Sequence, residues 1–206
     1  MSGRRALYAL LGLAALAGVL IELGNAVAEG GDGERLIRLF SYFTIQSNLL
    51  VVLSSALLVA RPAGGGRVQA VIQLDALLCI LVTGVVYHTV LAGEAAQLTP
   101  SGQVANLLLH TVSPVGAVLV WLLAGPRPRW TWSSVGWSVV YPLAWVAYTF
   151  LRGAAVGWYP YPFLDVGELG LAVALRNTAV VAVVFLVLAV LARGVERLLP
   201  ATPAAD

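Results

Sequence analysis

Six long apolar stretches restrict what this chain can fold into. Each holds about 20 mostly apolar residues, the length that an α-helix needs to cross the hydrocarbon core of a bilayer, and short polar or Pro- and Gly-rich breaks separate them. Charged residues make up 11% of the chain and hydrophobic residues 60%, whereas a typical soluble domain has about 25% charged residues. The sequence therefore predicts an all-α polytopic membrane protein, a six-transmembrane-helix bundle.

The predicted helices and their loops use nearly all of residues 1–206, so we expect a single transmembrane domain. The helices are predicted near residues 6–25, 36–60, 68–92, 102–124, 132–151 and 168–193.

The arginines indicate how the bundle is oriented. One end of a six-helix zigzag collects Arg4, Arg5, Arg61, Arg67, Arg127, Arg129, Arg193 and Arg197. Basic residues in short loops are retained on the cytoplasmic side, so both termini are predicted to be cytoplasmic. Residues 4–28 also resemble a secretory signal peptide that ends in Ala26-Val27-Ala28. Their apolar run is longer than a usual signal core, and we expect the first helix to be retained.

Two of the predicted helices carry a polar stripe at helical spacing, which cannot face lipid. The first stripe consists of Ser41, Thr44, Asn48 and Ser55, and the second of Gln103, Asn106, His110 and Ser113. We expect the two stripes to face each other across a cavity. Pro114 is predicted to kink the fourth helix one turn below His110 and to free a backbone carbonyl there.

Thr44 and His110 are the predicted catalytic pair. Each lies eight residues from the predicted outer end of its helix, or about 12 Å deep. A threonine hydroxyl is a poor nucleophile without a base, and histidine can take its proton near neutral pH. Asn106 or Asn48 is predicted to stabilise an oxyanion. Asp75 is too deep to complete a triad. Alone, Thr44 would indicate little, because intramembrane threonines usually bond to a carbonyl of the preceding turn.

Arg176 is predicted at the same depth in the sixth helix. An arginine at mid-membrane is costly, so we expect Arg176 to face the bundle interior and to hold a carboxylate or carbonyl of a ligand. A structural bond to Glu22 or to helix-end carbonyls is the alternative. His88, His110 and Glu22 offer a weaker metal hypothesis, because no spacing places two ligands on one helix face. We therefore expect no metal and no cofactor.

The segment after the fifth predicted helix is stiff and aromatic, from Gly157 to Asp165, and is a candidate lid at the outer mouth. Trp158 and Tyr161 in this segment, Tyr148 at the end of the fifth helix and His88 at the outer end of the third are further candidates for substrate binding. No basic cluster is dense enough to bind nucleic acid.

Three segments together carry a family resemblance. They are FSYFTIQSNL around Thr44, N-x-x-x-H-T-x-x-P from Asn106 to Pro114, and Y-P-F-L from Tyr161 to Leu164. The chain resembles the androgen-induced and androgen-dependent TFPI-regulating membrane proteins, a multi-pass family of threonine hydrolases, and their bacterial relatives. The resemblance implies a Thr44 nucleophile, a His110 partner and hydrolysis of fatty acid esters of hydroxy fatty acids. The family's fifth-helix histidines are replaced here by Tyr148-Thr149-Phe150.

The sequence thus predicts a lipid-ester hydrolase of a bacterial plasma membrane, with lipid as substrate and surroundings. A small transporter or lipid-binding protein is the alternative, since polar stripes can also line a permeation path. A structural bundle with a degenerate site is a third possibility.

Overall fold

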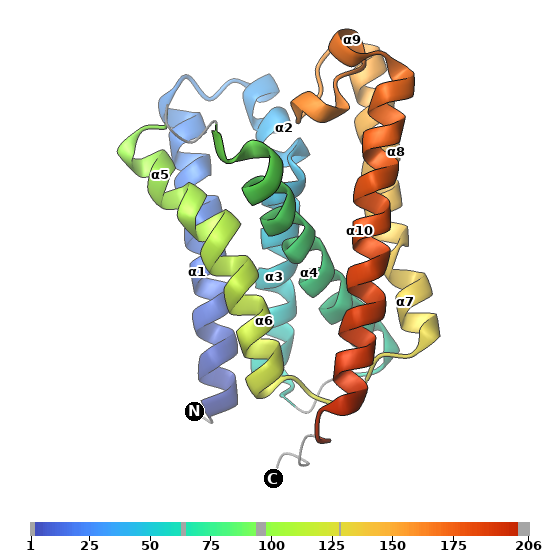
Figure 1. Cartoon of the computed structure of the whole chain (residues 1–206). Helices are drawn as coiled ribbons and strands as arrows, with labels where there is room; N and C mark the ends of the chain where they lie inside the picture. Colours follow the sequence, from blue (N-terminus) through green and yellow to red (C-terminus); the bar gives the residue numbers. More distant parts are fainter. Residues whose placement is uncertain (1–2, 63–64, 94–97, 128, 202–206) are drawn as a thin grey trace.

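The structure is a computed structural model that describes residues 3–62, 65–93, 98–127 and 129–201. Every regular element in these ranges is helical, and six helices are long and apolar enough to cross a membrane. The predicted all-α polytopic membrane bundle is therefore confirmed. The spans are Gly3–Ala28, Phe43–Ala60, Arg67–Leu91, Pro100–Ala124, Trp132–Val156 and Leu171–Leu198. The start of α1, the first span, and the end of α10, the last span, lie at the same end of the bundle (Figure 1).

The second span is shorter than the sequence predicts. The prediction of one helix over residues 36–60 is wrong, because Tyr42 adopts an extended conformation that separates α2 (Gly33–Ser41) from α3 (Phe43–Ala60). Asp32 caps α2 by accepting from the Arg35 backbone N–H, but no side chain caps α3. The break leaves the first N–H groups of α3 without partners in their own helix, and Thr44 is the second residue of that helix.

Two spans contain a short π-helical segment, and the two segments lie at the same end of the bundle. The third span continues from α4 (Arg67–Val86) into η1 (Tyr87–Leu91). The fourth runs through α5 (Pro100–Leu107), η3 (Leu108–Val112) and α6 (Ser113–Ala124). Pro114 has no N–H to donate to His110, and the Ser113 N–H reaches back to Leu108. The distortion predicted around Pro114 is thus a π-helical turn that contains His110.

The last two spans form a helical pair joined by an irregular segment. The fifth consists of α7 (Trp132–Ser138) and α8 (Val140–Val156), and the sixth is α10 (Leu171–Leu198). Between them lie the one-turn elements η4 (Pro162–Leu164) and α9 (Val166–Leu169). Gly157 ends α8 in the left-handed region, at φ 66°, a conformation that glycine adopts without strain. Because α10 begins at Leu171, the predicted start of the sixth helix at residue 168 is three residues too early.

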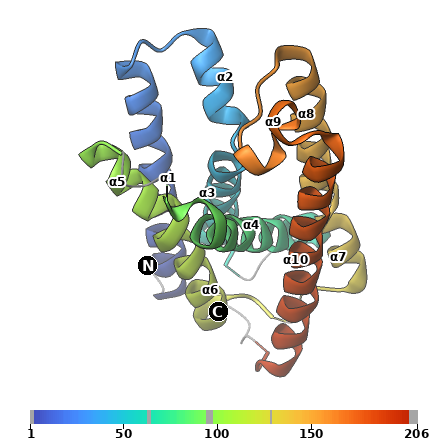
Figure 2. The ribbon, with the colours of Figure 1, turned by 45° about the horizontal axis from the view of Figure 1, so that its top comes forward.

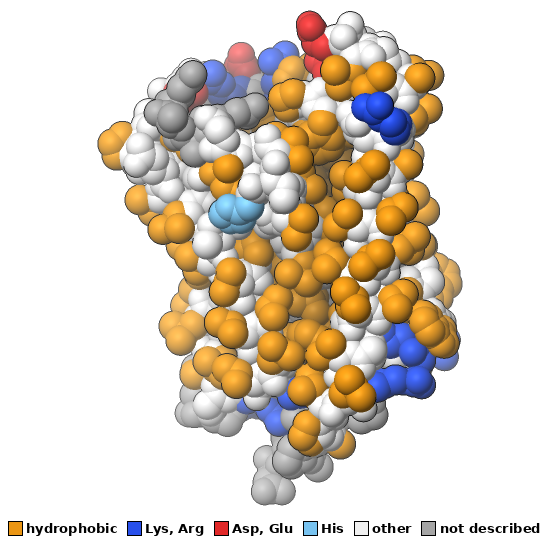
Figure 3. All heavy atoms as spheres, viewed as in Figure 1, with side chains coloured by type: hydrophobic (Ala, Val, Ile, Leu, Met, Phe, Trp, Pro, Cys, Tyr) orange, Lys and Arg blue, Asp and Glu red, His pale blue; other side chains and the backbone are white. Residues whose placement is uncertain are grey.

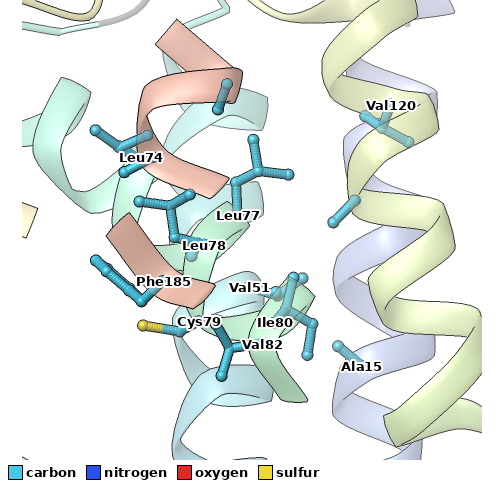
Figure 4. Packing of buried hydrophobic residues seen from close by; sticks show 14 of the residues in the cluster. Ala15, Val51, Leu74, Leu77, Leu78, Cys79, Ile80, Val82, Val120 and Phe185 are labelled. Carbon is cyan, nitrogen blue, oxygen red and sulfur yellow. The ribbon is translucent and has the colours of Figure 1, made fainter. Parts of the chain in front are cut away.

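Helix α4 is the centre of the bundle. It contacts α3, α6, α7 and α10 and is inclined to the neighbouring spans (Figures 1 and 2). Its inner half is packed tightly: Leu74, Leu78, Cys79 and Ile80 are fully buried, and Figure 4 shows them between neighbouring helices. The face of the bundle in Figure 3 is mostly hydrophobic, with charged side chains near its two ends. This distribution is the one that a bilayer requires.

Candidate functional site

The structure brings Thr44 and His110 together from two separate spans. The Thr44 Oγ1 and His110 Nε2 atoms are 3.3 Å apart, and the Thr44 side chain is only 7% exposed. Thr44 lies in the first turn of α3, and His110 lies in η3. The threonine hydroxyl is therefore directed at the imidazole of another helix.

The other ring nitrogen of His110 defines which tautomer is present. Nδ1 is 3.2 Å from the backbone carbonyl oxygen of Asn106. A carbonyl only accepts, so Nδ1 carries the proton and Nε2 presents its lone pair to Thr44. The Tyr87 ring stacks on the imidazole, with centroids 4.1 Å apart, and Asn106 Nδ2 donates to the Tyr87 hydroxyl. His110 is thus held in the orientation that a general base needs.

Tyr161 completes the group of polar atoms around Thr44. Its hydroxyl oxygen is 3.1 Å from the Thr44 backbone nitrogen and 3.2 Å from Thr44 Oγ1. The Tyr161 ring stacks on Phe163 and meets Tyr42 edge to face. Asn177 Nδ2 donates to the Phe163 carbonyl and so ties this segment to α10. The aromatic segment after α8 therefore reaches Thr44 directly.

A cavity of about 370 Å³ begins at these polar groups, within the range of about 300–1,000 Å³ that is usual for ligand sites. Its polar lining comes from Thr44, Thr83, Tyr87, His110, Tyr161 and Thr178. Apolar side chains of α4, α8 and α10 form most of the rest, together with Phe43, Leu91, Val139, Phe163 and Leu164. On α10 the lining extends from Thr178 to Leu186, about 12 Å along the helix.

The cavity has a polar end and an apolar end. Because α8 is antiparallel to α10, Val139 and Phe185 lie at the end away from Thr44. Figure 4 shows Phe185 beside Cys79, which is fully buried. Leu143 and Leu186 line the cavity and are 59% and 47% exposed. The face in Figure 3 is hollowed beside α10, with hydrophobic side chains in the hollow. The cavity thus extends along the bundle beneath a thin, lipid-facing wall.

Asn48 and Asn106 do not take the oxyanion-binding position expected of them, because their amides are engaged elsewhere. Asn48 is fully buried, and its Nδ2 atom donates to the carbonyls of Thr44 and Leu109. Asn106 supports Tyr87. Neither residue lines the cavity. Asn48 instead links α3 to η3, the two elements that carry Thr44 and His110.

The expectation that Arg176 faces the bundle interior is wrong. Its side chain is exposed, contacts Asn177 Oδ1 at 3.4 Å and does not line the cavity. Since α10 begins at Leu171, Arg176 is only about 7.5 Å from the helix start. A long arginine side chain at that depth can extend its charge to the interface.

Three other candidates from the sequence lie around the site without lining the cavity. His88 is exposed and contacts Thr111 Oγ1. The Tyr148 hydroxyl contacts Ser41 Oγ at 2.7 Å. The Trp158 ring contacts the guanidinium groups of Arg38 and Arg152, which lie 5.3 and 5.0 Å from its centroid. These residues shape the outer rim and do not touch the polar end of the cavity.

The metal hypothesis gains no support from the structure. Among the described residues, no three His, Cys, Asp or Glu side chains are grouped to hold a metal ion.

Sequence reasoning missed the residues that build the walls of the site. Tyr87, Trp145 and Phe185 line the cavity, yet in the sequence they are single aromatic residues in apolar helices. Only Tyr87 had a signal, its position beside His88.

No protein-family model, curated protein or solved structure matches this chain.

Proposed function

We propose that this chain is an intramembrane hydrolase of lipid esters, with Thr44 as nucleophile and His110 as its base. The observation that carries the proposal is the contact of Thr44 Oγ1 with the unprotonated Nε2 atom of His110 at the head of an apolar cavity. A nucleophile, a base and a group that orients the base are the arrangement that acyl transfer requires.

In the first step the Thr44 hydroxyl proton moves to His110 Nε2 while Oγ1 bonds to the ester carbonyl carbon. The carbonyl electron pair moves onto its oxygen. When that pair returns, the bond to the leaving alcohol breaks, and the alcohol oxygen takes the proton from His110. Water then attacks the acyl-threonine, His110 accepts one of its protons, and this proton returns to Thr44 Oγ1 as the fatty acid leaves. Each step uses the imidazole as base and then as acid.

The cavity supports a lipid substrate. Its lining beyond the polar end is apolar, so an acyl chain fits there better than a charged group does. The thin wall at Leu143 and Leu186 favours sideways entry from the bilayer. The resemblance to threonine hydrolases adds fatty acid esters of hydroxy fatty acids as the substrate class and a bacterial plasma membrane as the location.

The transporter alternative is less well supported. Thr44, Tyr87, His110 and Tyr161 lie at one end of the cavity, and Phe185, beside the fully buried Cys79, closes the other end. A permeation path needs polar groups toward both faces, whereas a hydrolase needs a pocket with one reactive end.

The test is labelling of the purified protein by a fluorophosphonate probe, together with hydrolysis of p-nitrophenyl octanoate. We expect Thr44→Ala to abolish labelling and to lower turnover by at least about a thousandfold. We expect His110→Ala to lower turnover by about 10²–10⁴-fold, the usual contribution of a general base.

Thr89→Ala is the matched control, because the Thr89 hydroxyl bonds only to backbone carbonyls of its own helix. It must keep full activity. Thermal unfolding in detergent must show that each variant is folded. Hydrolysis at the original rate by folded Thr44→Ala protein overturns the proposal.

A further inference from the structure

The Tyr161 hydroxyl is positioned to act in catalysis. It contacts two atoms of the same residue, the Thr44 backbone nitrogen and Oγ1. The backbone N–H only donates, so the phenol oxygen accepts from it, and the phenol proton is free to point to Thr44 Oγ1. The Thr44 proton then points to His110 Nε2. These directions form one chain of donors from Tyr161 to Thr44 to His110.

The Thr44 N–H is itself an unusual group. The break at Tyr42 leaves it at the start of an 18-residue helix with no partner in that helix, where the helix dipole favours negative charge. When Thr44 Oγ1 attacks an ester, the carbonyl oxygen develops its charge close to the attacking residue. The Thr44 N–H now donates to the Tyr161 hydroxyl, and it can donate to that oxygen instead once a substrate enters.

We propose that the Tyr161 hydroxyl and the Thr44 backbone N–H together bind the oxyanion of the transition state. The inference rests on the proposed hydrolase function and assigns Tyr161 as a catalytic residue. As the carbonyl electron pair moves onto oxygen, this oxygen accepts from both donors. No proton is transferred to it, and both donor bonds relax when the pair returns to expel the alcohol.

The surroundings of Tyr161 suit this role. Loss of hydration at its half-buried position raises the pKa of Tyr161 to about 12, so the phenol keeps its proton at neutral pH. Stacking on Phe163 and the Asn177 bond to the Phe163 carbonyl hold the ring in place before substrate arrives. Donors that are fixed in advance stabilise developing charge most effectively. The amides of Asn48 and Asn106 are already bonded to other groups.

The decisive variant is Tyr161→Phe, which keeps the ring and removes the hydroxyl. We expect kcat for p-nitrophenyl octanoate to fall by about 10²–10³-fold, the usual cost of losing one oxyanion donor, with KM nearly unchanged. Inhibition by an octyl trifluoromethyl ketone, which forms an oxyanion on Thr44, is expected to weaken by the same factor as kcat/KM. A merely structural tyrosine would not produce this parallel.

Tyr159→Phe is the matched control. It lies in the same segment, and its ring packs against Phe150 away from the cavity, so its kcat must be unchanged. 4-Aminophenylalanine at position 161 retains a weaker donor on the same ring and is expected to give an intermediate kcat, which also serves if Tyr161→Phe does not fold.

Unchanged kcat in either position-161 variant overturns the role of Tyr161. If Thr44→Ala is inactive at the same time, the proposed hydrolase stands and only this inference fails. If Thr44→Ala remains active, the proposed function itself fails.

Discussion

Two helix pairs with similar apolar sequences are packed very differently. In the spanning windows of α3 and α4, 50% and 61% of the residues are buried inside the protein, against 17% for the α7–α8 span and 22% for α10. Mean hydropathy does not explain the difference, because it is highest in α10, at 2.5. What differs is the position in the bundle, because α3 packs against α1 and α4, and α4 contacts α3, α6, α7 and α10. Buried hydrogen bonds join these central elements, between Ser47 and Thr83 and from Asn48 to the Leu109 carbonyl of η3.

The difference separates the two tasks of the site. Thr44 and His110 lie on elements that contact α1, α4 and each other, so their mutual geometry is fixed. Helices α8 and α10 contribute apolar walls and leave space between themselves and α4. Catalytic groups require rigid support, whereas a slot for a flexible lipid chain does not. Four predictions test this comparison, from the largest expected effect to the smallest.

Removing the Asn48 amide, which links α3 to η3, is expected to have the largest effect. Asn48→Leu removes the buried donor to the Leu109 carbonyl, and leaving that carbonyl unsatisfied costs about 1–3 kcal/mol. The Thr44 carbonyl still accepts from Ser47 Oγ. Asn177→Leu removes the half-buried α10 donor to the Phe163 carbonyl, and the loss of this hydrogen bond costs about 0.5–1.5 kcal/mol. Thermal unfolding in detergent measures both. Equal losses of stability would contradict the comparison.

Close packing beside His110 gives the second prediction. A Cβ atom added at Gly84 would lie 2.9 Å from the Pro114 Cβ atom, so Gly84→Ala must push α4 away from the start of α6. We expect a loss of about 1–3 kcal/mol, as for other overpacked sites, and slower fluorophosphonate labelling.

Gly136→Ala is its control in α7, where an added Cβ meets nothing within 4 Å. It is expected to be neutral or slightly stabilising. A stable, fully reactive Gly84→Ala protein would mean that this contact tolerates expansion and that the half carrying His110 is not rigid.

The third prediction concerns α10, one of the apolar walls of the cavity. Phe185→Ala enlarges the apolar end of the cavity, so the preferred p-nitrophenyl ester is expected to have a longer acyl chain. The change in kcat/KM for that longer ester is about tenfold or more, since each buried methylene is worth a factor of about 10–200. Phe150→Ala, whose ring lies outside the cavity, must leave the preference unchanged. An unaltered preference in Phe185→Ala means that the chain lies elsewhere.

The smallest effect is expected at the outer rim, where Glu34 joins α2 to α8. The hydrogen bond from Arg38, followed by that from Arg152, holds the pKa of Glu34 below its usual range. The charged carboxylate is therefore favoured in the folded protein. Its stabilising contribution is present above the ordinary carboxyl pKa and is lost as pH falls through the lowered pKa.

Glu34→Gln is expected to lower the thermal midpoint slightly at neutral pH, because exposed ion pairs contribute little. The difference from the original protein must disappear in strongly acidic buffer. A difference that grows on acidification contradicts the assignment.

The prediction of six spans was correct because the apolar stretches extend over most of the chain and the breaks are strong. Finer features depended on single residues. Tyr42 is an ordinary residue for a helix, and nothing in the sequence around it signals the break that starts α3. The depths expected for Thr44, His110 and Arg176 assumed unbroken helices. His110 still meets Thr44, but Arg176 is exposed on α10 and lies closer to the helix start than predicted.

The sequence by itself determined that the protein is a helical membrane bundle and which polar residues its spans must shelter. It did so because the cost of placing polar groups in hydrocarbon depends on composition and helical spacing alone. Only the tertiary structure decided that the Tyr161 hydroxyl, 117 residues from Thr44 along the chain, accepts a hydrogen bond from the Thr44 N–H. It also decided that α8 and α10 enclose a cavity against α4. These features depend on how separate helices pack and on a segment without helical periodicity, so local sequence does not encode them.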